Sequence, residues 1–235
     1  MLTAILFAAM SATLSVPADS IARPADPVIA ARKFKPQIFT EEFTGGSNEG
    51  GWSWDGGFPS IPQKGGNPKW YLRTHNDDTY APQVATAFGI DSEFTGNYRA
   101  KGVFRMGADF LTERVDFSAA DRPISLLLTS DPGTPDDPSD DCTIYTVGTA
   151  FAPVPGEGWR HYEFTLDRPD SHVLPGNWQV LDCNEPTPDA AWNRVFEDVD
   201  QAKFFYGDPT YFFEFQNFTV GVDNIFWLKF SEDLP

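Results

Sequence analysis

The sequence is poor in the residues that most often build a metal centre or a catalytic triad. It has two cysteines and three histidines among 235 residues, and His75, His161 and His172 lie far apart. Neither cysteine has a second cysteine or a histidine at ligand spacing, which disfavours a zinc site. G-x-S-x-G and H-E-x-x-H motifs are missing as well. The sequence therefore predicts no enzymatic activity.

Positive charge is also scarce. The chain carries 17 basic residues against 34 acidic ones, a formal net charge of -17. Such an excess of negative charge repels phosphate groups, so we expect neither nucleic acid nor an anionic membrane surface as a partner. After residues 2–10 the sequence has no further long apolar run, which predicts no membrane insertion.

The N-terminus has the character of an export signal. Residues 1–18 carry no charge and end at Val16-Pro17-Ala18, a small-residue cleavage pattern, although an apolar N-terminus without cleavage is the alternative. A secreted or extracytoplasmic location follows, in the periplasm or at the cell surface. Oxidising conditions there favour a Cys142–Cys183 disulfide over two free thiols.

From residue 37 onward, short β-rich runs alternate with turns that contain Gly, Pro, Asn and Asp. Residues 19–36 lack periodicity and predict a flexible segment, and residues 37–235 predict one domain. The fold class expected is all-β, an antiparallel β-sandwich of the jelly-roll type with one short helix. The predicted strands cover residues 37–43, 70–74, 83–88, 97–110, 124–129, 143–147, 159–166, 178–181, 202–206, 211–215 and 219–230.

The one predicted helix follows Asp189, a residue type suited to the N-cap, and continues to residue 198. Trp192, Val195 and Phe196 stand at positions i, i+3 and i+4, so they share one face. That apolar face is expected to cover one end of the sandwich.

Asp223 stands among apolar residues of the last predicted strand. A carboxylate there needs a partner, and a calcium ion held by oxygen ligands can supply it. If the first and last strands are neighbours, Glu42 and Asp223 converge on one structural calcium. Alternatively, Glu42 is a solvated edge charge and Asp223 caps a turn. The acidic loop 131–141 is a second candidate for calcium, although it lacks EF-hand spacing.

Aromatic residues gather around the glycine-rich turns between residues 45 and 70. Trp52, Trp54 and Trp70, together with Phe58, can offer flat rings to the apolar faces of sugars if they stay exposed. The alternative for each tryptophan is a place in the core, because a chain with 35 aromatic residues (21 Phe, 7 Trp and 7 Tyr) must bury most of them.

Several segments, in their order along the chain, resemble the laminin-B-type, galactose-binding-like jelly rolls of exported bacterial proteins. They are Phe39-Thr-Glu-Glu-Phe-Thr-Gly-Gly, Gly66-Asn-Pro68, Ala81-Pro82, Phe94-Thr-Gly-Asn-Tyr98, Gly158-Trp159, Trp192 and Gly221-Val-Asp-Asn-Ile225. The resemblance implies adjacent first and last strands, a structural calcium at Glu42 and Asp223, and a non-catalytic module that often binds carbohydrate.

The function expected is thus a secreted, non-catalytic module that binds a polysaccharide or extracellular matrix. One alternative is a structural or protein-interaction module of the envelope that binds no sugar. A polysaccharide-degrading enzyme on a similar sandwich is the other.

Overall fold

The computed structural model describes residues 35–116, 122–133, 139–168, 170–211 and 216–231. The predicted leader and residues 19–34 lie outside this part, and the first strand begins at Lys35, two residues before the predicted start. Of the predicted strand 211–215, Tyr211 is described and lies in a bend, while the other four residues fall outside. Among the described residues, no helix combines the length and apolar character needed to cross a membrane.

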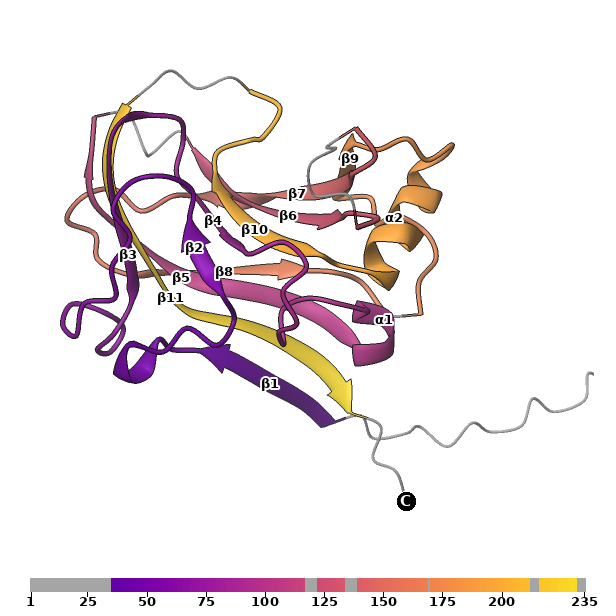
Figure 1. Ribbon diagram of the computed structural model, residues 1–235, viewed down its shortest axis with the longest axis horizontal. Coiled ribbons are helices and arrows are strands. Elements are labelled where there is room, and N and C mark those ends of the chain that lie inside the picture. The colour runs from indigo at the N-terminus through magenta and orange to yellow at the C-terminus, as the bar shows by residue number, and fades with distance from the viewer. Residues whose placement is uncertain (1–34, 117–121, 134–138, 169, 212–215, 232–235) are drawn as a thin grey trace, which may run out of the picture. The chain divides into compact units, whose positions relative to one another are not determined.

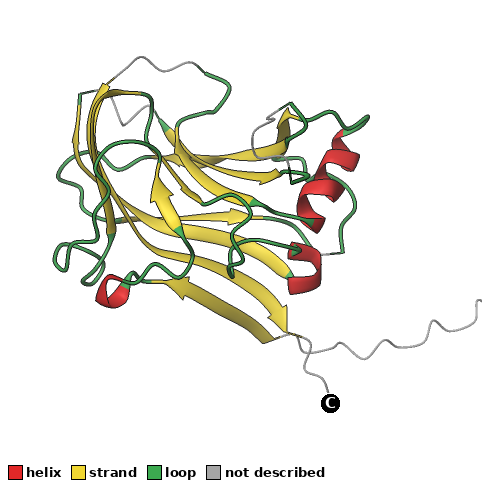
Figure 2. Cartoon of the chain, in the orientation of Figure 1, coloured by secondary structure: helices red, strands yellow, loops and turns green. Residues whose placement is uncertain are grey.

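Two antiparallel sheets form the fold (Figure 1). One has five strands: β1 (Lys35–Glu41), β11 (Gln216–Ser231), β5 (Val103–Val115) and β8 (Arg160–Thr165) in that order, with β3 (Leu72–Thr79) also paired to β11. The other has six, in the order β2 (Trp52–Trp54), β4 (Gln83–Thr86), β10 (Gln201–Tyr206), β6 (Pro123–Ser130), β7 (Cys142–Phe151) and β9 (Trp178–Asp182). Figure 2 shows how strongly strands outweigh helices. The predicted β-sandwich is confirmed.

The first and last strands are neighbours, as the sequence predicted. β1 pairs with β11 along its whole length, from Lys35 opposite Ser231 to Glu41 opposite Ile225. This pairing brings the loop after β1 close to the middle of β11, where Asp223 lies.

The structure differs in kind from the prediction at two places. The strand β2 was missed, because three residues are too few to show a period of two. The predicted strand 97–110 begins instead with a helical turn, α1 (Tyr98–Lys101). The Asn97 side chain accepts a hydrogen bond from the Ala100 N–H, and Gly102 ends the turn with a φ of 72°. An N-cap and a left-handed C-cap therefore outweigh the local β propensity.

The predicted helix exists as α2 (Pro188–Glu197), but its cap differs from the expectation. Thr187 is the N-cap residue, and its side chain accepts from the Ala190 N–H. Asp189 lies in the first turn, where its Oδ1 accepts from the Leu174 N–H at 2.9 Å. Pro188 explains the shift, because proline fits the first helical position. A short 3-10 helix, η1 (Thr44–Gly46), follows β1.

Aromatic rings from both sheets meet between the layers. Phe110 of β5 contacts Phe204 and Tyr206 of β10, with ring centroids 5.5 and 5.6 Å apart. Trp192 and Phe196 of α2 are buried and stacked at 4.1 Å. The predicted role of α2, an apolar face that closes one end of the core, is consistent with this packing.

Candidate functional site

The tryptophans predicted as sugar platforms belong to the core. Trp52 and Trp54 are 1% and 3% exposed, and Trp52 stacks on Phe204 at 5.7 Å. Trp70 is half-buried and packs against the same core. The alternation of β2 explains this outcome, because residues 52 and 54 share the face that points to the other sheet. Neither Trp52 nor Trp54 can present a ring face to a ligand from these positions.

Asp223 is buried beside a second carboxylate, Asp109, which lies opposite it in the β5–β11 register. Its oxygens accept from the backbone N–H groups of Asn67 at 2.6 Å and Asn224 at 2.8 Å. Asp109 accepts from both asparagine side chains, at 2.9 and 2.7 Å, and contacts His161 Nδ1 at 2.6 Å. The two carboxylates are thus surrounded by protein donors.

Electrostatics in this cluster favour a proton on Asp223. Burial raises its pKa to about 7, and the negative charges of Asp109 and Glu42 add to the effect, although the two N–H donors oppose it. Burial alone would lower the pKa of His161, but its bonds to Asp109 and Glu163 raise it. The His161 ring also stacks on Phe226 at 5.4 Å. The contact between His161 and Asp109 thus favours the protonated imidazole and ties β8 to the carboxylate pair.

The predicted calcium pair, Glu42 and Asp223, is near enough for one charge to influence the other. Glu42 is exposed, whereas the preceding Glu41 is buried and accepts from the N–H groups of Phe43 and Gly50 at 3.1 and 2.7 Å. Within the described residues, Glu42 and Asp223 are not part of a group of three or more metal-ligand side chains.

A different acidic group could hold a metal ion. Asp131, Asp140 and Asp141 bring one ligand oxygen each within 4.8 Å of the others. Burial and the charges of Asp131 and Asp140 raise the pKa of Asp141. All three residues belong to the acidic loop that the sequence marked as its second candidate.

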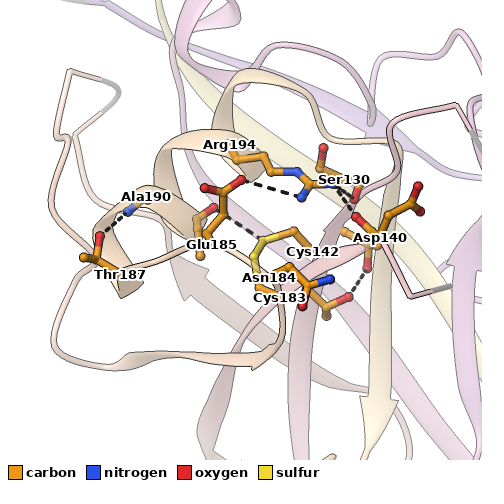
Figure 3. The surroundings of a disulfide bond; sticks show 12 residues. Ser130, Asp140, Cys142, Cys183, Asn184, Glu185, Thr187, Ala190 and Arg194 are labelled. Atoms are coloured by element: carbon orange, nitrogen blue, oxygen red, sulfur yellow. Dashed lines mark hydrogen bonds and ion pairs between the residues drawn. A yellow bond between two sulfur atoms is a disulfide. The ribbon is translucent and has the colours of Figure 1, made fainter.

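The predicted disulfide between Cys142 and Cys183 is confirmed and lies next to this loop (Figure 3). In the figure, Arg194 of α2 points toward Glu185 and toward the carbonyls of Ser130 and Asp140. The Nη2–O distance to Asp140 is 2.6 Å. The disulfide and this arginine together fix the ends of the acidic loop.

A groove of about 340 Å³ lies on the six-stranded sheet, where β2, β4 and β10 run side by side. Ser53, Ala85 and Lys203 are cross-strand neighbours there. Because Trp52, Trp54 and Phe204 point to the core, the alternating residues face outward. We call this the β2–β4–β10 groove. Its lining residues are Ser53, Trp54, Asp55, Ala85, Thr86, Ala87, Phe88, Gln201 and Lys203.

The groove contains polar groups that have no partner within the described chain. The Lys203 ammonium makes no hydrogen bond or ion pair within the described part of the chain, and burial lowers its pKa. The Gln201 side chain donates to the Thr86 carbonyl at 3.1 Å, but its buried Oε1 has no partner there. Phe88 is 46% exposed. One unpaired donor and one accessible ring therefore line the same groove.

The sequence interpretation missed this groove, although a signal was present. The segment Gln201-Ala-Lys-Phe-Phe-Tyr206 alternates in the manner of a half-buried strand and puts Gln201 and Lys203 on one face. A lysine in the middle of such a strand is unusual and marks an outward face. Asn67 gave no comparable signal, because its partners Asp109 and Asp223 are distant in the sequence.

Comparisons with known proteins find only structural matches. No protein-family model and no curated protein matches this sequence. One solved structure that matches is the family 11 carbohydrate-binding module of the cellulosomal cellulase Lic26A-Cel5E of Clostridium thermocellum, with 12% identity, 81% of this chain and 94% of that chain covered, and a TM-score of 0.44.

Two further matches are of the CBM22 type. The CBM22-1–GH10 modules of Clostridium thermocellum xylanase 10B match at 11% identity and a TM-score of 0.46, covering 82% of this chain and 28% of that chain. The CBM22-1 xylan-binding domain of Paenibacillus barcinonensis Xyn10C matches at 9% identity and 0.41, covering 84% and 97%. With TM-scores below 0.5, these similarities carry no argument about function.

Proposed function

We propose that this chain is a secreted, non-catalytic β-sandwich module that binds carbohydrate in the β2–β4–β10 groove. The observation that carries the proposal is the unpaired chemistry of the groove: the Lys203 ammonium lacks a partner among the described residues, and the Phe88 ring that lines the same groove is accessible. Sugars satisfy such a set, because hydroxyls both donate and accept while a pyranose face packs on an aromatic ring.

The same lining argues against hydrolysis in the groove. Glycosidases of the common types need two carboxyl groups on either side of the scissile bond. Asp55 is the one carboxylate among the described residues that line the groove, and its Oδ2 is engaged by the Gln83 amide. Binding without turnover is therefore the activity that this geometry supports.

Secretion is part of the proposal and is supported by the disulfide. A cross-link that closes a segment of 41 residues forms and persists in oxidising compartments. On the chain-entropy model it stabilises the fold by up to about 4 kcal/mol.

The experiment is affinity electrophoresis of the purified chain through gels that contain single soluble polysaccharides, followed by calorimetry on those that retard it. We expect retardation by at least one polysaccharide and no release of reducing sugar. If no polysaccharide changes the mobility of the protein, the proposal of carbohydrate binding is contradicted. A protein-interaction module of the envelope is then the remaining function. Release of reducing sugar would instead show an enzyme.

A structural calcium ion completes the proposal, with two possible positions. The Asp131–Asp140–Asp141 group is supported by three mutually close oxygens, whereas Glu42 and Asp223 belong to no such group among the described residues. We therefore place the ion at the Asp131–Asp140–Asp141 group.

Thermal unfolding with calcium and with chelator tests this placement. Calcium at a hundredfold excess over Kd stabilises the folded state by about 2.7 kcal/mol. Asp141→Asn should abolish the difference between the two conditions, whereas Asp223→Asn should keep it. The reverse result would return the ion to the first position, and no difference in the wild-type protein would remove calcium altogether.

A further inference from the structure

Lys203 occupies the interior of the six-stranded sheet, a place where a charged side chain needs a reason. It lies in β10 between two other strands, with Ala85 opposite on β4 and Leu127 opposite on β6. Neither neighbour can accept a hydrogen bond from its side chain. A half-buried ammonium in such surroundings loses hydration and gains nothing from the residues on either side.

Other basic residues of the described chain show what Lys203 lacks. Arg73 pairs with Glu113, and Arg105 pairs with Glu163, at 2.8 and 3.0 Å. Lys101 donates to three backbone carbonyls, at 2.7 to 3.3 Å. Acidic residues outnumber basic ones two to one in this chain, so a partner for one more lysine is easily supplied.

Asp55 is the carboxylate whose charge acts on Lys203, but it does not pair with the ammonium. Its charge acts on the ammonium, but the two side chains form no ion pair within 4.0 Å in the described structure. Asp55 instead engages the Gln83 amide. Burial remains the larger influence on Lys203 and lowers its pKa.

We propose that the ligand supplies the missing anion: the β2–β4–β10 groove binds a polysaccharide that carries a carboxylate group, and Lys203 binds that carboxylate. This inference rests on the proposed function and names the class of sugar. A carboxylate adds the attraction of opposite charges to its hydrogen bond with the ammonium, so a uronate satisfies Lys203 better than a hydroxyl does. Asp55, which also lines the groove, then accepts from a neighbouring hydroxyl.

The charge of the protein restricts the class further. One lysine faces the ligand, while the chain as a whole carries a net charge of -17. A dense polyanion would meet repulsion along its whole length. The ligand class is therefore a mainly neutral polysaccharide with isolated uronate groups.

The test uses polymers that differ only at the carboxylate. Glucuronoxylan, gum arabic and xanthan are each compared with the same polymer after chemical reduction of its carboxyl groups to hydroxyls, with mixed-linkage β-glucan as a neutral reference. Binding is measured by calorimetry at about 0.15 M salt, where the Debye length of about 8 Å screens distant acidic residues. We expect at least one native polymer to bind about tenfold to hundredfold more tightly than its reduced form.

Variants then assign the preference to Lys203. Lys203→Met should abolish the difference between native and reduced polymer, whereas Lys203→Arg should keep most of it. Lys64→Met is the matched control, because it removes the same charge from an exposed loop position outside the groove. Thermal unfolding checks that each variant is folded. If Lys203→Met is not folded, Lys203→Gln takes its place.

The outcomes separate the inference from the proposal beneath it. Equal binding of native and reduced polymers, or binding of neutral polymers alone, overturns the inference that the ligand carries a carboxylate. The proposal of carbohydrate binding then still holds. A preference for native polymer that survives in Lys203→Met overturns the role of Lys203. Failure to bind any polysaccharide overturns both.

Discussion

The outer faces of the two sheets differ in how their polar groups are satisfied. On the five-stranded sheet, Asp109 and Asp223 accept hydrogen bonds from Asn67, Asn224 and His161. On the six-stranded sheet, the β2–β4–β10 groove leaves Lys203 and Gln201 Oε1 without partners in the described chain. Buried polar groups are normally paired, so the Asp109–Asp223 cluster has the character of a structural network, and we interpret the unpaired ammonium of the groove as part of a binding site.

The pH dependence of stability is the largest effect expected from this contrast. The pKa of Asp223 is raised from its usual 3.8 to about 7 in the folded protein. The folded state therefore holds its proton more tightly, so this stabilisation is complete below pH 3.8 and is lost as the pH rises to about 7. The free energy lost is on the order of 4 kcal/mol.

Asp223→Asn isolates this contribution, because asparagine does not titrate. Urea unfolding of both proteins in chelator, between pH 4 and pH 8, should show the variant gaining on the wild type as the pH rises. Asparagine also changes the hydrogen bonds at this position, but that cost is the same at every pH, so it shifts the free energy of unfolding without changing its pH dependence. A difference that stays the same across this range would show that Asp223 is ionised in the folded protein.

Loss of Asp109 should destabilise the protein by about 3 kcal/mol. Asp109→Ala removes the acceptor for two asparagine side chains and the partner of His161, and each lost hydrogen bond costs about 1 kcal/mol because its donor is only partly buried. Relief of repulsion with Asp223 offsets part of this loss. Urea unfolding measures the change, with Asp109→Asn as the conservative comparison.

Polysaccharide binding by folded Asp109→Ala should match that of the wild type. If the variant is stable but no longer binds, the ligand binds on the five-stranded sheet, and the contrast between a structural face and a binding face is wrong.

In the groove, Phe88→Ala should weaken binding about fivefold, or about 1 kcal/mol, because it removes one accessible ring. Its effect on unfolding should be small, since the side chain is 46% exposed. Phe58→Ala is the control: that ring is 75% exposed but lies outside the lining of the groove. Calorimetry with the polysaccharide that binds most tightly measures both. Equal losses would mean that the groove has no special place for a ring.

The sequence predicted those features that depend on local pattern. The alternation of β8 and the run of apolar residues in β11 gave the strands, and the two cysteines gave the disulfide. The adjacency of first and last strands came from a resemblance and is confirmed by the register of β1 and β11. Asp223 was singled out because a carboxylate among apolar residues needs a partner.

What the sequence could not predict depends on contacts between distant segments. The partners of Asp223 include Asn67, which lies 156 positions away. Burial of Trp52 and Trp54 depends on which face of β2 meets the other sheet, and a strand of three residues does not show this. The groove itself exists only because β2, β4 and β10 pair side by side.

The smallest effect is expected at the edge of the five-stranded face, where Arg73 and Glu113 form a bidentate ion pair. Nε and Nη2 of the arginine bind the two carboxylate oxygens at 2.9 and 2.8 Å, and both side chains are about one third exposed, at 32% and 30%. Such pairs contribute 0.2 to 1 kcal/mol because water and salt screen them. Arg73→Met should thus lower the free energy of unfolding by about 0.5 kcal/mol, with a double-mutant cycle through Glu113→Gln to isolate the pair. Because Arg73 already has its partner, the variant should bind polysaccharide as the wild type does, whereas Lys203→Met removes a cation that has none. If Arg73→Met weakened binding as much as Lys203→Met, pairing within the chain would not distinguish the structural face from the binding face.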